Sequence, residues 1–293
     1  MKEQNQQNSG GGFDLGGLMG GLGGGDFGLI FGSPGGGKSW TMVALGAHAV
    51  KLGLNVVHYT LELSEGYVGK RYDAHFVNEP VNTIHLHKEK INKFIDDLSG
   101  SLTIKEYSPG QASISTLESH IQKITDLGYP PDLIILDYVD LLKSISSSKD
   151  EKEKLDNTYV ATKALARDLN IPVWSVSQVN RAGARDEIVE GDKAAGSYNK
   201  LMITDFCMSL SRLPQDKVNN TARFFLMKNR YGMDGMTYYA SMDASTGTIE
   251  MDENPTEIPE GSSTNNNRFG NEVTKTDKKQ LAQLSEDFFV NKG

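Results

Sequence analysis

The sequence predicts an α/β fold in which a mostly parallel central sheet is flanked by helices and carries antiparallel strands at its edge. Three observations lead to this fold class. Short, β-branched apolar runs bounded by turn residues recur along the chain, as buried strands do. Segments with helical spacing separate these runs, and strands that alternate with helices form parallel sheets through right-handed crossovers. In the last third, strand-like runs follow one another through short turns, which is typical of antiparallel strands.

The predicted elements can be placed in chain order. Buried strands are predicted at 27–31, 55–60, 102–107, 133–138 and 172–177. A helix is predicted between the third and fourth of these strands, because apolar residues recur there at helical spacing as Ile114, Leu117, Ile121 and Ile124. Strands added in antiparallel fashion to the sheet edge are predicted at 203–212, 221–230, 236–243 and 246–251.

Composition divides the chain into three parts. Residues 1–26 are polar and then dense in glycine, which predicts a flexible arm. Residues 27–252 hold the predicted strands and helices and form the core domain. Residues 253–293 are again poor in apolar residues and predict a flexible tail that ends in a short amphipathic helix, which packs either on its own domain or on a partner. The apolar face of that helix is formed by Leu281, Leu284 and Phe288.

The overall composition excludes several classes of protein. The net charge of −8 means that a polyanionic partner has to be bound by a local basic patch. The single cysteine, Cys207, rules out an intramolecular disulfide, and no apolar run approaches the roughly 20 residues that span a bilayer. We therefore expect a protein of the reducing cytoplasm with no membrane partner.

A glycine-rich stretch, "FGSPGGGKSW" at 31–40, follows the first predicted strand and opens a helix. It matches the phosphate-loop pattern G-x-x-x-x-G-K-[ST] through Gly32, Gly37, Lys38 and Ser39. Backbone amides of such a loop point at phosphate oxygens, the lysine neutralises the β and γ phosphates, and the serine hydroxyl binds Mg²⁺. Trp40 comes next and either packs beneath the loop or touches the base. The residues predicted to contact a nucleotide here are Ser33, Pro34, Gly35, Gly36, Gly37, Lys38, Ser39 and Trp40.

Two carboxylates are predicted to lie at the same edge of the sheet as this loop. Asp137 ends the run "LIILD", where it can hold Mg²⁺ together with Ser39. Glu62 follows the strand at 55–60 and is the candidate to orient and deprotonate an attacking water. Glu65 is the competitor, but it lies further into the loop.

The order of these motifs resembles the DnaB-type replicative helicases, especially their phage branch, whose ATPase core has the RecA fold. The resemblance runs from about Phe27 to Met251. It rests on the phosphate loop followed by "TLELSEGYVGKR", "DLIILDYVDLL", "IPVWSVSQVNRAG", "GSYNKLMITDFCMSLSR" and "LMKNRYG". It implies an ATP-dependent, Mg²⁺-requiring helicase that works as a hexameric ring on single-stranded DNA, with a primase or another replisome component as a possible partner of the tail.

The resemblance also implies roles for individual residues. It makes Glu62 the catalytic carboxylate and places Arg71 near the nucleotide. Gln178 matches the glutamine that senses the γ-phosphate and relays its loss to the loop that follows. Lys228 and Arg230 match the K-x-R pair that family members insert into the ATP site of the next subunit, where arginine stabilises transition-state charge.

The family's strand-binding loop corresponds to the segment after Gln178. Its predicted DNA contacts are Arg181, Arg185, Lys193 and Gly196. In a ring, repeated copies of a few cations line one channel, so that an acidic chain still binds DNA.

Two other functions stay open from the sequence. A RecA-type recombinase or mediator would hold DNA in a filament, although the "DYVDLL" and "SQVNR" blocks favour the helicase branch. A regulatory RecA-fold ATPase would assemble without moving along DNA. Stimulation of ATP hydrolysis by single-stranded DNA separates this last class from the first two.

Overall fold

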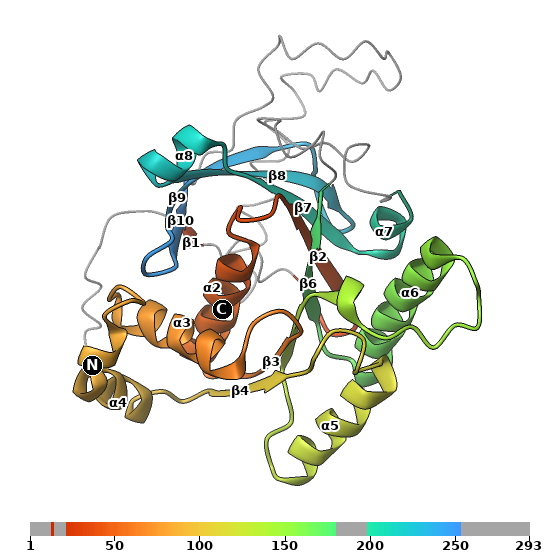
Figure 1. Cartoon of the computed structure of the whole chain (residues 1–293), viewed down its shortest axis with the longest axis horizontal. Coiled ribbons are helices and arrows are strands. Elements are labelled where there is room, and N and C mark those ends of the chain that lie inside the picture. The colour runs from red at the N-terminus through yellow and green to blue at the C-terminus, as the bar shows by residue number, and fades with distance from the viewer. Residues whose placement is uncertain (1–12, 15–21, 180–197, 253–293) are drawn as a thin grey trace, which may run out of the picture. The chain divides into compact units, whose positions relative to one another are not determined.

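The computed structural model describes residues 13–14, 22–179 and 198–252. All of them lie in one compact unit. In these ranges, ten strands form a single sheet in the order β1-β10-β9-β8-β7-β2-β6-β5-β3-β4 (Figure 1). The parallel strands are β2 (Phe27–Gly32), β3 (Asn55–Thr60), β4 (Ser101–Glu106), β5 (Leu133–Asp137), β6 (Val173–Gln178) and β7 (Phe206–Ser211). The antiparallel strands are β1 (Phe13–Asp14), β8 (Thr221–Asn229), β9 (Thr237–Asp243) and β10 (Thr248–Met251).

This sheet confirms the predicted fold class, with one correction. The run at 203–212 was expected to pair antiparallel, but β7 runs parallel to β2, with Gly28 beside Phe206 and Gly32 beside Leu210. The prediction was wrong because α7 (Tyr198–Ile203) precedes β7, so that the connection from β6 is a crossover and not a hairpin. Antiparallel pairing begins with β8, where Ser211 lies opposite Arg223.

Helices cover both faces of the sheet, as Figure 1 shows. On one face, α2 (Lys38–Lys51), α3 (Glu65–Val77) and α4 (Lys88–Asp96) share a hydrophobic core with residues such as Ile30 and Trp174. On the other face, α5 (Ile114–Asp126) and α6 (Glu151–Leu169) pack over Leu29 and Phe31. Adjacent residues of β2 therefore point into different cores, and burial on both faces explains why its sequence is continuously apolar. The remaining short helices are η1 (Ile84–Leu86), η2 (Val139–Leu141) and α8 (Pro214–Asn219).

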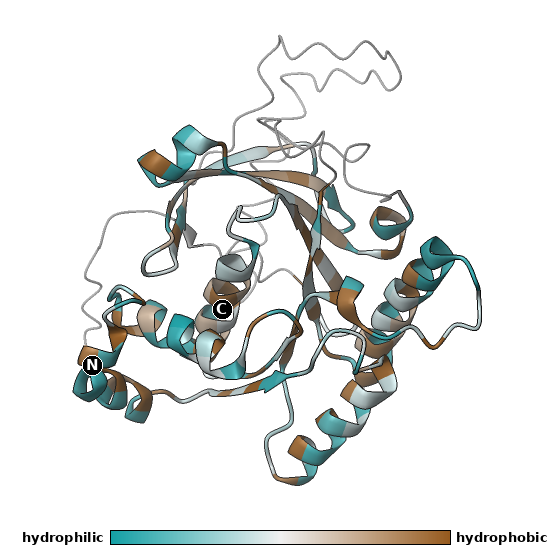
Figure 2. Cartoon of the chain, viewed as in Figure 1, coloured by the Kyte–Doolittle hydropathy of each residue, from teal (hydrophilic) through white to brown (hydrophobic). Residues whose placement is uncertain are grey.

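The best predicted helix is α5. Its buried residues are the four whose spacing predicted it, Ile114, Leu117, Ile121 and Ile124. The helix begins after Ser113, whose hydroxyl accepts a hydrogen bond from the Thr116 amide in a capping box. Figure 2 shows the resulting pattern, in which helices expose hydrophilic residues and the central strands are largely hydrophobic.

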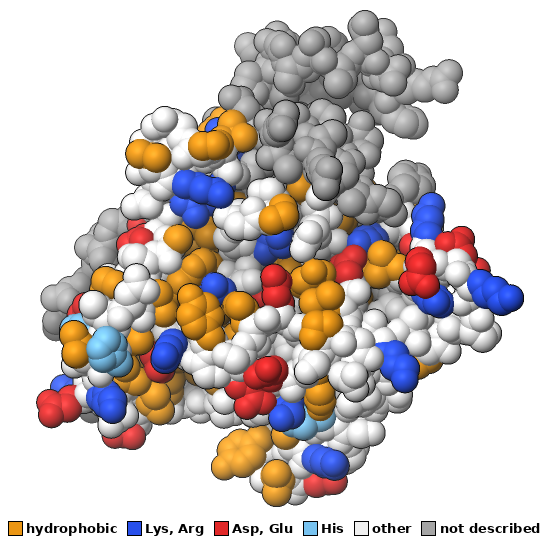
Figure 3. All heavy atoms as spheres, viewed as in Figure 1, with side chains coloured by type: hydrophobic (Ala, Val, Ile, Leu, Met, Phe, Trp, Pro, Cys, Tyr) orange, Lys and Arg blue, Asp and Glu red, His pale blue; other side chains and the backbone are white. Residues whose placement is uncertain are grey.

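Part of the segment predicted as a flexible arm pairs with the sheet. Phe13 lies opposite Met251 and Asp14 opposite Glu250, so that β1 becomes the edge strand beside β10. The boundaries predicted at 26 and 252 stay predictions, and the predicted helix around Leu281 lies outside the described residues. On the face shown in Figure 3, acidic and basic side chains are interspersed.

Candidate active site

The carboxyl ends of four parallel strands bring the predicted site residues to one edge of the sheet. Gly32 at the end of β2 pairs with Gln178 at the end of β6. Asp137 at the end of β5 pairs with Thr60 of β3, and its carbonyl oxygen accepts a 2.8 Å hydrogen bond from the Leu61 amide. Glu62 is the next residue along the chain. Residues far apart in the sequence thus converge because parallel strands end at a common edge.

The phosphate loop depends on glycine at two positions. Gly35 and Gly37 have φ of 66° and 104°, in the region that favours glycine. A Cβ on Gly37 would also overlap the Cε of Met242, so that β9 packs directly against the loop. The Lys38 ammonium donates 3.0 Å hydrogen bonds to the carbonyl oxygens of Gly32 and Ser33. The loop and its lysine are therefore held in a folded conformation by the surrounding protein.

Lys38 lies in an environment that combines burial with nearby negative charge. Burial lowers the pKa of its ammonium, and the carboxylates of Asp137, Glu62 and Asp140 oppose this shift in that order. All three acids therefore lie close enough to act on the lysine.

Asp137 is a buried carboxylate close to the Ser39 hydroxyl. It is 1% exposed, and neither side-chain oxygen has a hydrogen-bond partner among the described residues. Burial raises its pKa, an effect that the nearby Ser39 hydroxyl opposes and the Glu62 carboxylate strengthens. A buried carboxylate beside a serine hydroxyl offers the hard oxygen ligands that Mg²⁺ prefers. The residues at this position therefore fit a magnesium ion, with Asp137 and Ser39 as the groups that would hold it.

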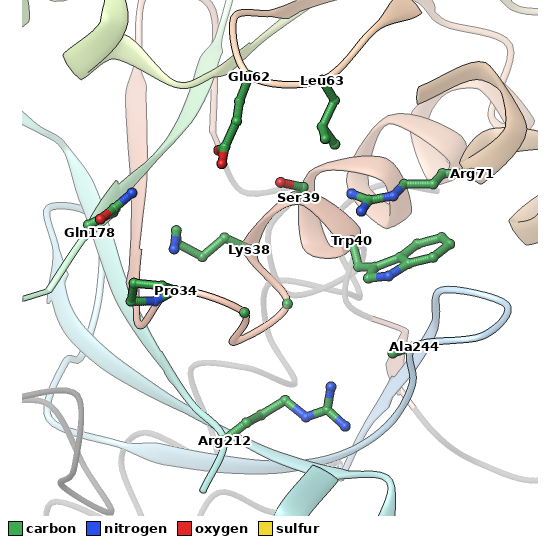
Figure 4. Close-up of a pocket in the computed structure, with 12 residues that line it drawn as sticks. Pro34, Lys38, Ser39, Trp40, Glu62, Leu63, Arg71, Gln178, Arg212 and Ala244 are labelled. Atoms are coloured by element: carbon green, nitrogen blue, oxygen red, sulfur yellow. The ribbon is translucent and has the colours of Figure 1, made fainter. Parts of the chain in front are cut away.

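The structure distinguishes Glu62 from its competitor Glu65. Glu62 lines the pocket, and its side chain extends into it between Gln178 and Ser39 (Figure 4). Glu65 instead accepts hydrogen bonds from the Lys105 ammonium at 3.1 Å and from the Glu106 amide at 2.8 Å. Because these bonds tie Glu65 to β4, Glu62 is the carboxylate available to a molecule in the pocket.

Arg71 and Trp40 form one side of the pocket. The Arg71 guanidinium lies 4.8 Å from the Trp40 ring centroid and 4.9 Å from that of Tyr67, within the range of cation–π attraction. Trp40 is 8% exposed and packs against Gly247, where a Cβ would overlap its ring. Trp40 is thus a core residue that also lines the pocket, and its contact with a base stays a prediction.

The pocket itself encloses about 340 Å³. Of the residues predicted to contact a nucleotide, Ser33 and Gly36 do not line it, although both belong to the loop that does. Sequence reasoning missed three lining residues, Leu63, Arg212 and Ala244. The Arg212 guanidinium is anchored by hydrogen bonds to the carbonyl oxygens of Thr221 and Met242, and burial lowers its pKa. In the sequence, Arg212 is visible only as a basic residue at the end of the run that forms β7. Nothing in the sequence connects that position to the phosphate loop. The lining residues are Pro34, Gly35, Gly37, Lys38, Ser39, Trp40, Glu62, Leu63, Arg71, Gln178, Arg212 and Ala244.

Gln178 lies across the pocket from Arg71 (Figure 4). Its amide nitrogen donates a 3.2 Å hydrogen bond to the Tyr138 hydroxyl. Tyr138 follows Asp137 directly, so this contact joins the end of β6 to the end of β5. Only Val179 separates Gln178 from the segment 180–197, which carries the predicted DNA contacts.

Arg230 lies near the amino ends of the parallel strands, whereas the pocket lies at their carboxyl ends. Its amide donates a 2.9 Å hydrogen bond to the carbonyl oxygen of Asp205, whose own amide bonds to the carbonyl oxygen of Phe27 at the start of β2. Five residue steps along β2 then separate this position from Gly32, which corresponds to about 16 Å at roughly 3.3 Å per residue. Arg230 therefore cannot reach the pocket of its own chain, and its guanidinium forms a 2.7 Å ion pair with the buried Asp205 carboxylate.

Lys228 makes contacts within its own chain. Its ammonium donates hydrogen bonds to the carbonyl oxygens of Leu201, Met202 and Thr204, at 2.6, 3.2 and 2.6 Å. These contacts cap the end of α7, and burial lowers the pKa of the ammonium. A role in a neighbouring site stays a prediction for this residue.

The predicted DNA contacts Arg181, Arg185, Lys193 and Gly196 lie outside the described residues. None of the helices in the described ranges has the length and apolar character needed to cross a membrane.

The chain is similar to known helicases over much of its length. Residues 9–190 match the family model described as the DnaB-like helicase C terminal domain. The chain is 25% identical over 245 residues to the DnaB-like replicative helicase of Enterobacteria phage T4, which covers 76% of this chain and 51% of that protein. It is 27% identical over 181 residues to a probable replicative DNA helicase of Trieres chinensis, covering 59% of this chain and 40% of that protein. The chain thus spans about half the length of the phage relative and less of the second.

Solved structures agree on the fold. One of them, described as an ATPase domain, aligns with a TM-score of 0.66 at 17% identity, covering 76% of this chain and 84% of that one. A second, described as a DnaB-like replicative helicase and its interactions with primase, aligns with a TM-score of 0.69 at 17% identity and covers 78% of this chain and 59% of that one.

Proposed function

Since the chain belongs to the family of DnaB-like helicase C-terminal domains, we propose that it is the ATP-driven motor of a replicative DNA helicase. In this proposal, copies assemble into a ring, most simply a hexamer, and hydrolyse ATP where two copies meet. Hydrolysis drives movement along single-stranded DNA and separates the duplex. The similarity to a phage helicase suggests that the protein works in the cytoplasm of a phage-infected bacterium.

One observation carries the hydrolytic part of the proposal. Lys38 and Glu62 line one pocket, and the Asp137 carboxylate lies close enough to act electrostatically on Lys38 while it is buried without a hydrogen-bond partner among the described residues. A group of this kind is costly to keep unless a ligand satisfies it. ATP with Mg²⁺ supplies both the phosphates for Lys38 and the cation for Asp137.

The roles we propose follow from where each side chain lies. Loop amides and Lys38 bind the phosphates, and Asp137 and Ser39 would hold Mg²⁺, which neutralises phosphate charge when bound. Glu62 orients a water molecule and accepts its proton. Arg71 and Trp40 border the opposite side of the pocket, and Gln178 is placed to contact the terminal phosphate.

The position of Arg230 supports hydrolysis between copies. An arginine about 16 Å from its own phosphate loop along β2 can stabilise transition-state charge only on a nucleotide held by another chain. The Arg230 side chain is 52% exposed despite its ion pair with Asp205, so it is accessible to a neighbour.

Three measurements test the proposed function. The rate of ATP hydrolysis should rise strongly when a single-stranded oligonucleotide is added, and a forked duplex should be unwound. Stimulation without unwinding would indicate a recombinase, and the absence of stimulation would indicate a regulatory ATPase. The particle mass, measured with a non-hydrolysable ATP analogue and an oligonucleotide, should be about six times the chain mass, and a particle with the mass of one chain would contradict assembly.

Mixing variants tests whether the site is shared. Glu62→Gln copies and Arg230→Ala copies should each be nearly inactive, because each lacks one half of every site. A mixture should recover part of the activity, because some contacts then combine an intact Glu62 with an intact Arg230. If the mixture is no more active than its components, hydrolysis does not use Arg230 from a second chain.

A further inference from the structure

A buried lysine joins the two strand ends that carry the candidate active site. Lys200 in α7 is 2% exposed, although lysine is rarely buried unless it is paired. Its ammonium donates hydrogen bonds to a carboxylate oxygen of Asp140 and, at 2.8 Å, to the Ser177 hydroxyl. It also lies 4.8 Å from the ring centroid of Tyr159, whose hydroxyl donates a 2.7 Å hydrogen bond to the other oxygen of Asp140. We call these four residues the Lys200 cluster.

Two members of the Lys200 cluster lie close in sequence to residues of the site. Asp140 follows Asp137 by three positions, on η2, and Ser177 directly precedes Gln178 on β6. The ammonium of Lys200 therefore bridges the ends of β5 and β6, in parallel with the hydrogen bond between Gln178 and Tyr138.

The buried ion pair of the Lys200 cluster is better suited to fixing the positions of α7, η2 and β6 than to raising the free energy of unfolding. Moving an ion pair out of water costs about as much as the mutual attraction returns, and apolar residues of similar size often replace such pairs without loss. A buried pair of this kind fixes the relative positions of the elements that carry it, since any shift breaks hydrogen bonds that water cannot replace.

Helix α7 is also held at its other end. The ammonium of Lys228 binds the carbonyl oxygens of Leu201, Met202 and Thr204, and Arg230 lies two residues further along the chain. The helix begins at Tyr198, directly after the segment 180–197, which carries the predicted DNA contacts. A single short helix thus follows the DNA segment, contacts the strand ends of the pocket and binds the strand that leads to Arg230.

We propose that Lys200 is a positioning residue that couples DNA binding to the nucleotide pocket. A displacement of α7 moves the ammonium, and Asp140 and Ser177 must follow it or lose buried hydrogen bonds. Their displacement in turn moves Asp137 and Gln178. This inference rests on the proposed function, because it requires that DNA binds the segment preceding α7.

The test measures thermodynamic coupling instead of turnover. The affinity for a fluorescent, non-hydrolysable ATP analogue is determined with Mg²⁺, with and without a saturating single-stranded oligo(dT). The ratio of the two affinities defines the coupling, which typically lies between about 5- and 150-fold and must equal the effect of nucleotide on oligo(dT) affinity. Lys200→Met keeps the length of the side chain and removes the charge. We expect Lys200→Met to lower the coupling ratio roughly fivefold or more, and to about one if the ratio of the parent protein is itself small. The affinity for the nucleotide analogue without DNA should change less than about twofold.

Further variants separate coupling from folding. Lys200→Met leaves Asp140 without its cation, so Lys200→Met/Asp140→Asn should recover thermal stability without recovering the coupling ratio. Tyr159→Phe removes one hydroxyl from the cluster and should lower the ratio by a smaller factor. Arg223→Met breaks the ion pair between β8 and Asp216 of α8, away from α7, and should leave the ratio unchanged.

The outcomes distinguish this inference from the proposed function. If the parent protein shows coupling and both the double variant and Tyr159→Phe retain it in full, Lys200 has a structural role alone and the inference is overturned. If coupling returns together with thermal stability in the double variant, the inference is likewise overturned. If the parent protein does not bind oligo(dT), the proposed function fails first and the inference fails with it.

Discussion

Replacing Asp137 by asparagine should have opposite effects on the stability of the protein with and without its ligand. The substitution keeps the size of the side chain and removes its charge. In the structure neither carboxylate oxygen has a hydrogen-bond partner among the described residues, and burial and the Glu62 carboxylate raise the pKa of Asp137 despite the opposing effects of Ser39, Arg71 and Lys38. The parent residue therefore destabilises the ligand-free fold.

The expected magnitude follows from the burial of this one group. Leaving a buried polar group unsatisfied costs about 1–3 kcal/mol, and more when the group is charged. The asparagine amide is still buried and polar, so Asp137→Asn removes only the additional cost of the charge and should raise the ligand-free unfolding free energy by about 1 kcal/mol. For a domain of this size, each kcal/mol corresponds to roughly 2–4 °C in Tm. The parent protein should in turn gain about 2.7 kcal/mol from Mg²⁺ and a non-hydrolysable ATP analogue at about 100 times Kd, and most of that gain should be lost in the variant.

Thermal and denaturant unfolding, each with and without Mg²⁺ and the analogue, provide the assay. Asp73→Asn is the matched control, because burial also raises the pKa of Asp73. That control should leave the stabilisation by Mg²⁺ and the analogue unchanged. A ligand-free Asp137→Asn protein less stable than the parent would mean that the carboxylate has a favourable partner, and the argument for a cation site would then be refuted.

Three further predictions follow from the described contacts. Glu62→Gln should retain nucleotide binding and lower kcat by roughly 10²–10⁴, whereas Glu65→Gln should keep near-parent turnover; equal losses in a steady-state ATPase assay would contradict the assignment. His58, whose pKa burial lowers to about 3, is neutral in the fold and protonates near pH 6.5 when unfolded, so its contribution is complete above pH 6.5. As the pH falls from 6.5 toward 3, the unfolding free energy should drop by up to about 1.4 kcal/mol per pH unit. Denaturant titrations repeated at several pH values should show that the unfolding free energy of His58→Asn depends less steeply on pH. Gly37→Ala should lower unfolding free energy by about 2–5 kcal/mol through backbone strain and overlap with Met242, and a double-mutant cycle with Met242→Ala should show less than additive loss.

The parallel half of the sheet was predictable because local patterns determine it. Strands such as β3 and β5 are short apolar runs between turn residues, and α5 buries the four residues whose spacing marked it. The direction of β7 was not predictable in the same way. Strand direction depends on the path of the preceding connection, and in this chain α7 follows the segment 180–197 and leads into a strand parallel to β2, where we expected an antiparallel strand.

The candidate site divides in a similar way. The phosphate loop, Asp137 and Glu62 could be proposed because each lies at or just beyond the end of a recognisable strand. Arg212 and the Lys200 cluster could not, since an arginine or lysine near a strand has no sequence signal that distinguishes a solvated side chain from a buried one. Their contacts depend on packing between elements that are distant in sequence, as with Lys200 and Ser177.

The separation of Arg230 from the phosphate loop by the length of β2 has a genetic consequence. If copies assemble as proposed, a chain with a defective Arg230 impairs a neighbour's turnover while its own pocket stays intact. Such an allele would be dominant when expressed beside the normal gene. In each mixed assembly, some subunits with an intact pocket would receive no arginine from the neighbouring mutant chain.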